Sequence, residues 1–189
     1  MHEFKDGTVQ KKSYFIEFYD IGGNISHRKS AKMFYNNVDG IILVHDLTNR
    51  KSEENLKYWL ADVLEENESM SICSASETHL SPTKSTYSSN NNSNMPPLLV
   101  IGTKSDQAQL VRNSLRTCTS YVAAQYRADE INLDCMEPKS LAPATTNSIK
   151  LAKFFDKAIE YKLTQQVRMG SLRSIDSINK NTLFQSKLK

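Results

Sequence analysis

The sequence lacks the features that define several other classes of protein. None of its 189 residues belongs to a run approaching the roughly 20 apolar residues that a membrane-spanning helix needs, and residues 1–12 are charged. The 24 basic and 21 acidic residues are mixed along the chain, so no broad basic surface for nucleic acid is expected. We therefore expect a soluble, cytoplasmic protein that does not bind nucleic acid.

Cysteine is scarce as well. The three cysteines, Cys73, Cys118 and Cys135, show no CxxC spacing. An odd set without that spacing argues against a disulfide framework or a structural zinc site and is typical of a reducing compartment. No cysteine follows Cys135, so there is no CaaX box and we expect no lipid anchor.

Glycine is sparse too, and none of the six glycines is followed by another glycine five residues later. The sequence therefore contains no GxxxxGK[ST] motif. That motif supplies the backbone N–H groups, the lysine and the magnesium-binding hydroxyl that hold the phosphates of a nucleotide.

Apolar runs alternate with helical patterns along most of the chain. Ile41–Val44 and Leu98–Thr103 are continuous apolar runs, which are typical of strands covered on both faces. Strands are predicted at 13–19, 41–44, 98–103 and 131–135, and helices at 52–64, 107–127 and 146–161. This order predicts an α/β fold with three layers and a mostly parallel sheet.

Composition divides the chain into a domain and two polar segments. Residues 1–162 form the predicted domain. Within it, residues 68–97 are rich in Ser and Asn and hold too little apolar matter to order, so we predict a disordered insertion. Residues 163–189 form a basic tail, for which disorder and a weakly amphipathic helix are both open.

Polar residues follow each predicted strand, where parallel sheets bind their ligands. These residues are Asp20 and Gly23 after the first strand, Asp46 after the second, Thr103 to Asp106 after the third, and Asp134 with Cys135 after the fourth. We expect all of them to lie at one edge of the sheet.

Two of these groups predict nucleotide chemistry. Asp20 is placed to hold Mg²⁺ through water, with the Gly23 N–H reaching a terminal phosphate. The sequence Thr103-Lys104-Ser105-Asp106 suits guanine, because a carboxylate accepts from N1–H and the exocyclic amine while the lysine stem covers the base. Singly, each group is also an ordinary turn or helix start. Their joint occurrence in this order favours a nucleotide site.

With these motifs the chain resembles the small GTPases of the Ras superfamily. The blocks YDIGGN, FYNNVDGIILVHDLTNRKS, PLLVIGTKSD, EINLDC and KLAKFFDKAIE resemble the Rab-like protein 3 family of animals. The resemblance implies a P-loop-GTPase-like fold that binds GTP or GDP with Mg²⁺. It also implies other small GTPases or their prenylation machinery as partners, and a homodimer.

The resemblance assigns roles to particular residues. Lys104, Ser105 and Asp106 would contact guanine, and Asp134 with Cys135 would touch the base from the other side. Asp20 and Gly23 would belong to the magnesium and switch II region.

The chain departs from the family pattern in two places. The phosphate-binding loop is missing, and so is the first strand of the fold, whose place in the sheet is between the strands predicted at 13–19 and 41–44. We therefore expect an N-terminally truncated chain that has a gap in its sheet and binds nucleotide weakly. Asn24 replaces the glutamine that orients water in many relatives, so no catalytic residue is assigned. A guanine-nucleotide switch and a non-catalytic interaction or dimerisation module both remain open.

Overall fold

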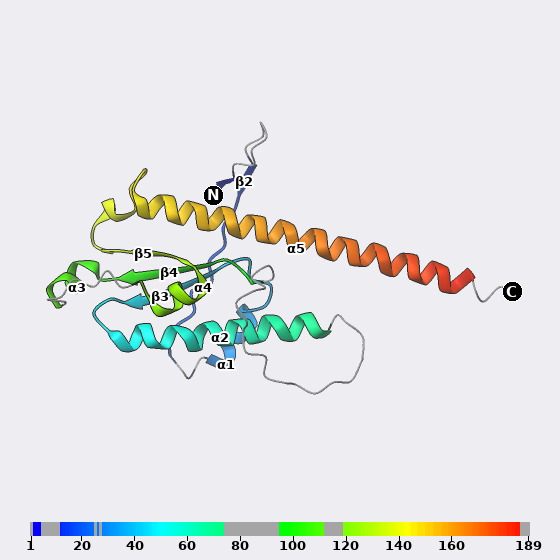
Figure 1. Cartoon of the computed structure of the whole chain (residues 1–189), viewed down its shortest axis with the longest axis horizontal. Helices are drawn as coiled ribbons and strands as arrows, with labels where there is room; N and C mark the ends of the chain where they lie inside the picture. Colours follow the sequence, from blue (N-terminus) through cyan, green and yellow to red (C-terminus); the bar gives the residue numbers. More distant parts are fainter. Residues whose placement is uncertain are drawn as a thin grey trace.

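The computed structural model describes residues 2–4, 12–24, 26, 28–73, 95–111 and 119–185. In chain order the strands and helices are β1 (His2–Phe4), β2 (Lys12–Tyr14), α1 (Arg28–Ala31), the 3-10 helix η2 (Lys32–Phe34), β3 (Ile41–Asp46), α2 (Arg50–Cys73), β4 (Leu98–Thr103), α3 (Ser105–Val111), α4 (Tyr121–Tyr126), β5 (Asp129–Asn132), the 3-10 helix η4 (Pro138–Leu141) and α5 (Thr146–Gln185). From β3 onward, each strand is separated from the next by helix (Figure 1).

The central sheet has three parallel strands in the order β3-β4-β5. Ile41 pairs with Leu98 in β4, and Leu99 of β4 pairs with Asp129 in β5. Parallel neighbours need a crossover connection, which α2 supplies between β3 and β4. The α/β class and the parallel sheet predicted from the sequence are confirmed.

Helices cover both faces of this sheet, as the three-layer prediction requires. Along β4, Val100 packs with Leu60 of α2 on one face, while Leu99 packs with Ile131 and with Phe154 of α5 on the other. Figure 1 shows α2 and α5 running along opposite faces. Since burying one aliphatic side chain is worth about 1.5–3 kcal/mol, these two clusters hold the layers together.

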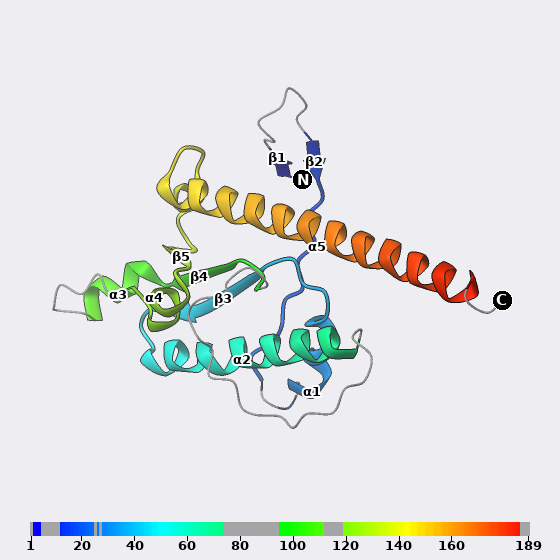
Figure 2. The same cartoon turned by 45° about the vertical axis from the view of Figure 1, so that its right-hand side comes forward.

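The β1-β2 hairpin forms a separate antiparallel sheet. It lies beyond α5 from the three-stranded sheet (Figure 2) and contacts this helix through His2, whose Nε2 is 2.7 Å from Asp156 Oδ1. The predicted strand 13–19 ends at Tyr14, and Phe15 is 89% exposed. A strand needs a hydrogen-bonding neighbour. Among the described residues no strand lies between residues 15–19 and β3, so these residues do not form a strand.

One predicted strand and one predicted helix also have other bounds in the structure. The strand predicted at 131–135 is β5 at Asp129–Asn132, because the chain turns at Asp134, whose carboxylate accepts from Met136 N at 2.9 Å. The helix predicted at 107–127 is divided into α3 and α4, and residues 112–118 lie outside the described part. Ser120 starts α4 by accepting from Ala123 N at 3.1 Å.

The two polar segments contain helix where the structure describes them. Helix α2 continues to Cys73, so residues 68–73 of the predicted insertion are helical, and 74–94 lie outside the described residues. Helix α5 runs on to Gln185 and projects past the sheet (Figure 2), so it includes residues 163–185. Among the described helices, none is long and apolar enough to cross a membrane.

Candidate functional site

The carboxyl ends of β4 and β5 are joined by backbone hydrogen bonds. Leu133 N donates to Gly102 O at 2.7 Å, and Ser105 N donates to Leu133 O at 3.1 Å. The second bond ties the start of α3, which follows Lys104 and carries Asp106, to the loop that carries Asp134. The structure thus brings together two of the residue groups that the sequence placed at one edge of the sheet.

Gly102 leaves room at the strand ends for two neighbouring side chains. A Cβ atom at Gly102 would lie 2.6 Å from Asn132 Oδ1 and 2.7 Å from Leu47 Cδ2. Both distances are shorter than van der Waals contact, so a side chain here would displace the neighbours that frame the two loops.

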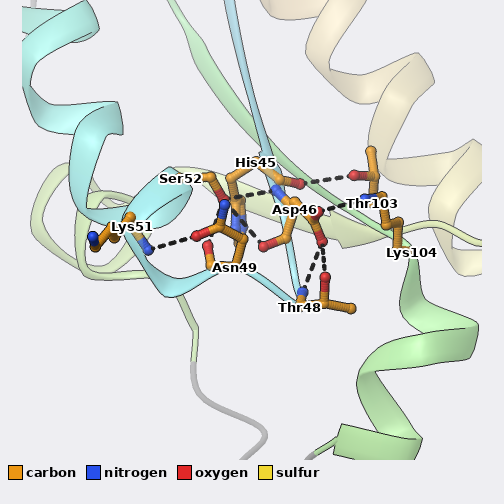
Figure 3. A network of polar contacts seen from close by, with 8 residues as sticks. All are labelled: His45, Asp46, Thr48, Asn49, Lys51, Ser52, Thr103 and Lys104. Atoms are coloured by element: carbon orange, nitrogen blue, oxygen red, sulfur yellow. Dashed lines mark hydrogen bonds and ion pairs between the residues drawn. The ribbon is translucent and has the colours of Figure 1, made fainter.

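Lys104 turns the chain from β4 into α3. Its backbone is left-handed, with φ of 58°, and its carbonyl accepts from Ala108 N at 3.0 Å, in the first turn of the helix. The side chain reaches back over the strand ends, and its Nζ lies 2.6 Å from Asp46 Oδ2 (Figure 3). The preceding Thr103 also contacts β3, since its Oγ1 donates to His45 O at 3.0 Å.

Asp46 is the centre of the polar network in Figure 3. Its Oδ1 accepts from Thr48 N at 2.8 Å and from Thr48 Oγ1 at 2.7 Å, while its backbone N donates to Ser52 Oγ at 3.0 Å. The Lys104 ammonium, followed by the Thr48 donors, lowers the pKa of the Asp46 carboxyl from 3.8 to about 2.

Asp46 therefore makes the folding stability depend on pH in the acid range. Because its pKa is lower in the folded chain, its stabilising contribution is complete above about pH 4 and is lost as the pH falls through about 2. We expect Asp46→Asn to be less stable than the native chain at about pH 5, with the difference disappearing towards about pH 2. Urea unfolding across this range measures it, and a difference that stays constant with pH would contradict the assignment.

The Asp134 loop is held by several contacts. Asp134 O accepts from Ser140 Oγ at 3.0 Å, and Asn147 Nδ2 donates to Asn132 O at 3.0 Å.

Two of the residues predicted to contact the base are exposed. Cys135 is an exposed free cysteine beside Asp134. Asp106, in the first turn of α3, is also exposed, so its carboxylate is accessible to a ligand.

Asp20, Gly23 and Asn24 belong to a different set of contacts. All three are exposed, and the Tyr19 ring just before them lies 5.5 Å from the ring of Phe34. The Oδ1 atom of Asn24 accepts from Ser26 N at 3.0 Å and from Ser26 Oγ at 2.9 Å. No described contact joins these residues to the Lys104 loop, so their phosphate and magnesium roles stay predictions.

A further observation concerns the predicted ligands. The described residues contain no group of three or more His, Cys, Asp or Glu side chains that could hold a metal ion, which leaves Asp20 as a single candidate.

The sequence alone indicates Asp46 only as the residue that follows a strand. Its register position opposite Thr103, one residue before Lys104, is the signal that links it to the site.

Comparison with known proteins agrees with the fold. The family described as the Ras of Complex, Roc, domain of DAPkinase matches residues 1–81. This match and the parallel α/β sheet define the class as P-loop-GTPase-like, within the Ras superfamily.

Close relatives then define the family. "Rab-like protein 3" of Mus musculus is 43% identical over 166 residues, covering 85% of this chain and 67% of that protein. The Bos taurus protein of the same name is 42% identical over 165 residues, which cover 85% of this chain and 67% of that protein. The Xenopus tropicalis protein is 40% identical over 171 residues, which cover 88% of this chain and 70% of that protein. The chain belongs to the Rab-like protein 3 family of small GTPases. Proteins of this kind generally bind GTP or GDP with Mg²⁺.

Proposed function

We propose that this chain binds guanine nucleotides through the loops that follow β4 and β5. The observation that supports this most strongly is the bond from Ser105 N to Leu133 O, at 3.1 Å, which holds the Lys104 loop against the Asp134 loop. Asp106 accepts from N1–H and the exocyclic amine of guanine, and the Lys104 stem covers the base. Thr103 anchors this loop to β3, while Asp134 and Cys135 border the base from the other side.

In this proposal, contacts with the guanine base contribute most of the free energy with which this 189-residue chain binds a nucleotide. Without a GxxxxGK[ST] sequence the phosphates meet few backbone donors. In a form of the protein that carries this loop, Asp20 holds Mg²⁺ through water and Gly23 donates to the terminal phosphate. The Asn24 amide oxygen already accepts two hydrogen bonds from Ser26, which favours a regulatory switch over rapid GTP hydrolysis.

A nucleotide titration of the folded chain tests the proposal. We expect GDP to bind with a Kd of about 0.1–1 mM, and ADP to bind at least about tenfold more weakly because its base lacks the donors that Asp106 requires. GMP should bind about as well as GDP, since the phosphates contribute little. Fluorescence titration, with circular dichroism to confirm folding, measures all three. A folded chain that binds GDP no better than ADP would contradict the proposal.

A second candidate function is a non-catalytic interaction or dimerisation module. The observation that favours it is the exposure of Phe15 (89%) and of Phe18 (64%), whose ring lies 5.9 Å from that of Phe155 in α5. Exposed aromatic side chains are enriched at protein interfaces. Sedimentation of the native chain and of Phe18→Ser tests a homodimer, and a native chain that stays monomeric at all concentrations argues against it.

The family supports the remaining parts of the proposal. Cytoplasmic location, and an association with other small GTPases or their prenylation machinery, are what membership of this family leads us to expect. Co-purification of tagged protein with small GTPases from a cytosolic fraction tests both at once.

A further inference from the structure

We propose that Asp46 is a positioning residue of the base site, whose carboxylate holds the Lys104 ammonium and so fixes the lysine stem across the strand ends where guanine stacks. This inference rests on the proposed function and adds a residue that lies outside the Thr103 to Asp106 motif. Asp46 itself touches no base. It acts only through Lys104.

The sheet register places Asp46 beside the motif. Asp46 is the last residue of β3 and pairs with Thr103, the last residue of β4, so Lys104 leaves the sheet next to the Asp46 side chain. The two charged groups are 2.6 Å apart, and the lysine side chain keeps 51% of its surface exposed while that of Asp46 keeps 22%. The pair is therefore anchored on the aspartate side and accessible along the lysine stem.

The Asp46 carboxylate is fixed by other bonds before Lys104 is considered. Thr48 donates twice to Oδ1, at 2.8 and 2.7 Å, which leaves Oδ2 for the ammonium. Ser52 accepts from Asp46 N at 3.0 Å and donates to Asn49 O at 2.6 Å, so the first turn of α2 fixes the backbone as well. The carboxylate thus turns Oδ2 towards its lysine partner (Figure 3).

Lys104 is restrained at both ends. Its backbone is held in the left-handed region, with φ of 58°, between the Thr103 hydroxyl bond to β3 and the first turn of α3. Its ammonium is held by Asp46. A lysine stem restrained in this way loses less rotamer freedom when a base stacks on it, which corresponds to a gain in affinity of about three- to tenfold.

The opposite end of β3 offers a matched comparison. Asp39 precedes β3, and its Oδ2 lies 2.9 Å from Lys162 Nζ on α5. This second pair has the same chemistry and an equally exposed lysine, and it borders no loop at the carboxyl edge. An Asp39→Asn variant removes an aspartate–lysine pair without touching the proposed base site.

A double-mutant cycle on GMP binding tests the inference. The proteins are the full native chain, Asp46→Asn, Lys104→Met, the double variant and Asp39→Asn. Asparagine still accepts from Thr48, and methionine keeps an apolar stem without the charge, so each change removes the pair and little else. We expect Asp46→Asn and Lys104→Met each to weaken GMP binding about three- to tenfold, the double variant to be no weaker than Lys104→Met, and Asp39→Asn to match the native chain.

A ligand-free measurement separates the possible outcomes. The ¹³C resonance of the Asp46 carboxyl, followed against pH, should give a pKa that rises towards 3.8 in Lys104→Met if the pair exists in solution.

The binding cycle has two outcomes that would overturn the inference. If native protein binds GMP while Asp46→Asn binds it equally well, or if the two single effects add, the positioning role is overturned and the proposed function stands. If folded native protein binds no GMP, the proposed function fails and the positioning role fails with it.

Discussion

Replacing Gly102 with valine is expected to lower the free energy of unfolding by about 1–3 kcal/mol and to weaken nucleotide binding by what remains folded. The new Cβ would lie 2.6 Å from Asn132 Oδ1 and 2.8 Å from Leu47 Cγ, and the two methyl groups beyond it enlarge the overlap. The backbone bond from Leu133 N to Gly102 O, which aligns β5 with β4, lies at the same point.

Gly22 provides the matched control, because nothing lies within 4 Å of a Cβ built on it. Gly22→Val should unfold at nearly the urea concentration of the native chain, whereas Gly102→Val should unfold much earlier. Equal midpoints for the two variants would mean that the Asn132 and Leu47 side chains move aside at little cost, and would contradict the tight packing at Gly102.

Replacing Asp106 with asparagine is expected to reduce the preference for guanine over xanthine nucleotides by about 100-fold. The carboxylate accepts two hydrogen bonds from guanine, whereas the asparagine amide presents a donor that suits the second carbonyl of xanthine. Asp106 is exposed in the first turn of α3, so its replacement should cost the fold no more than about 1 kcal/mol.

Competition between GMP and XMP measures this preference in the native chain and the variant. Asp39→Asn is again the control, since it makes the same chemical change at an aspartate that pairs with Lys162. An unchanged guanine preference in Asp106→Asn would remove Asp106 from the base site, even if nucleotide binding itself persisted.

The sequence predicted those elements whose patterns are local. Leu98–Thr103 is a continuous apolar run, and the structure has β4 with the same bounds. Helix α5 begins at Thr146, as its apolar periodicity predicted. The strand predicted from Ser13 failed beyond Tyr14, because aromatic and β-branched composition does not reveal whether a neighbouring strand is available for pairing.

The candidate site was predictable in part for a similar reason. The rule that ligands bind beyond parallel strands located Lys104, Asp106 and Asp134 at one edge, and the bond between their loops agrees with it. The pair between Lys104 and Asp46 was not predictable, because it depends on the left-handed backbone at Lys104 and on residues 58 positions apart. Only the register of β3 against β4 brings these two side chains together.

The guanine site proposed at the loops after β4 and β5 can be mapped residue by residue by NMR. GMP and AMP are titrated separately into ¹⁵N-labelled chain and the amide shifts are compared. We predict saturable shifts with GMP, centred on Lys104, Ser105, Asp106, Asp134 and Cys135, and much smaller shifts with AMP. Shifts that are equal for the two nucleotides, or that centre elsewhere in the chain, would contradict the claim.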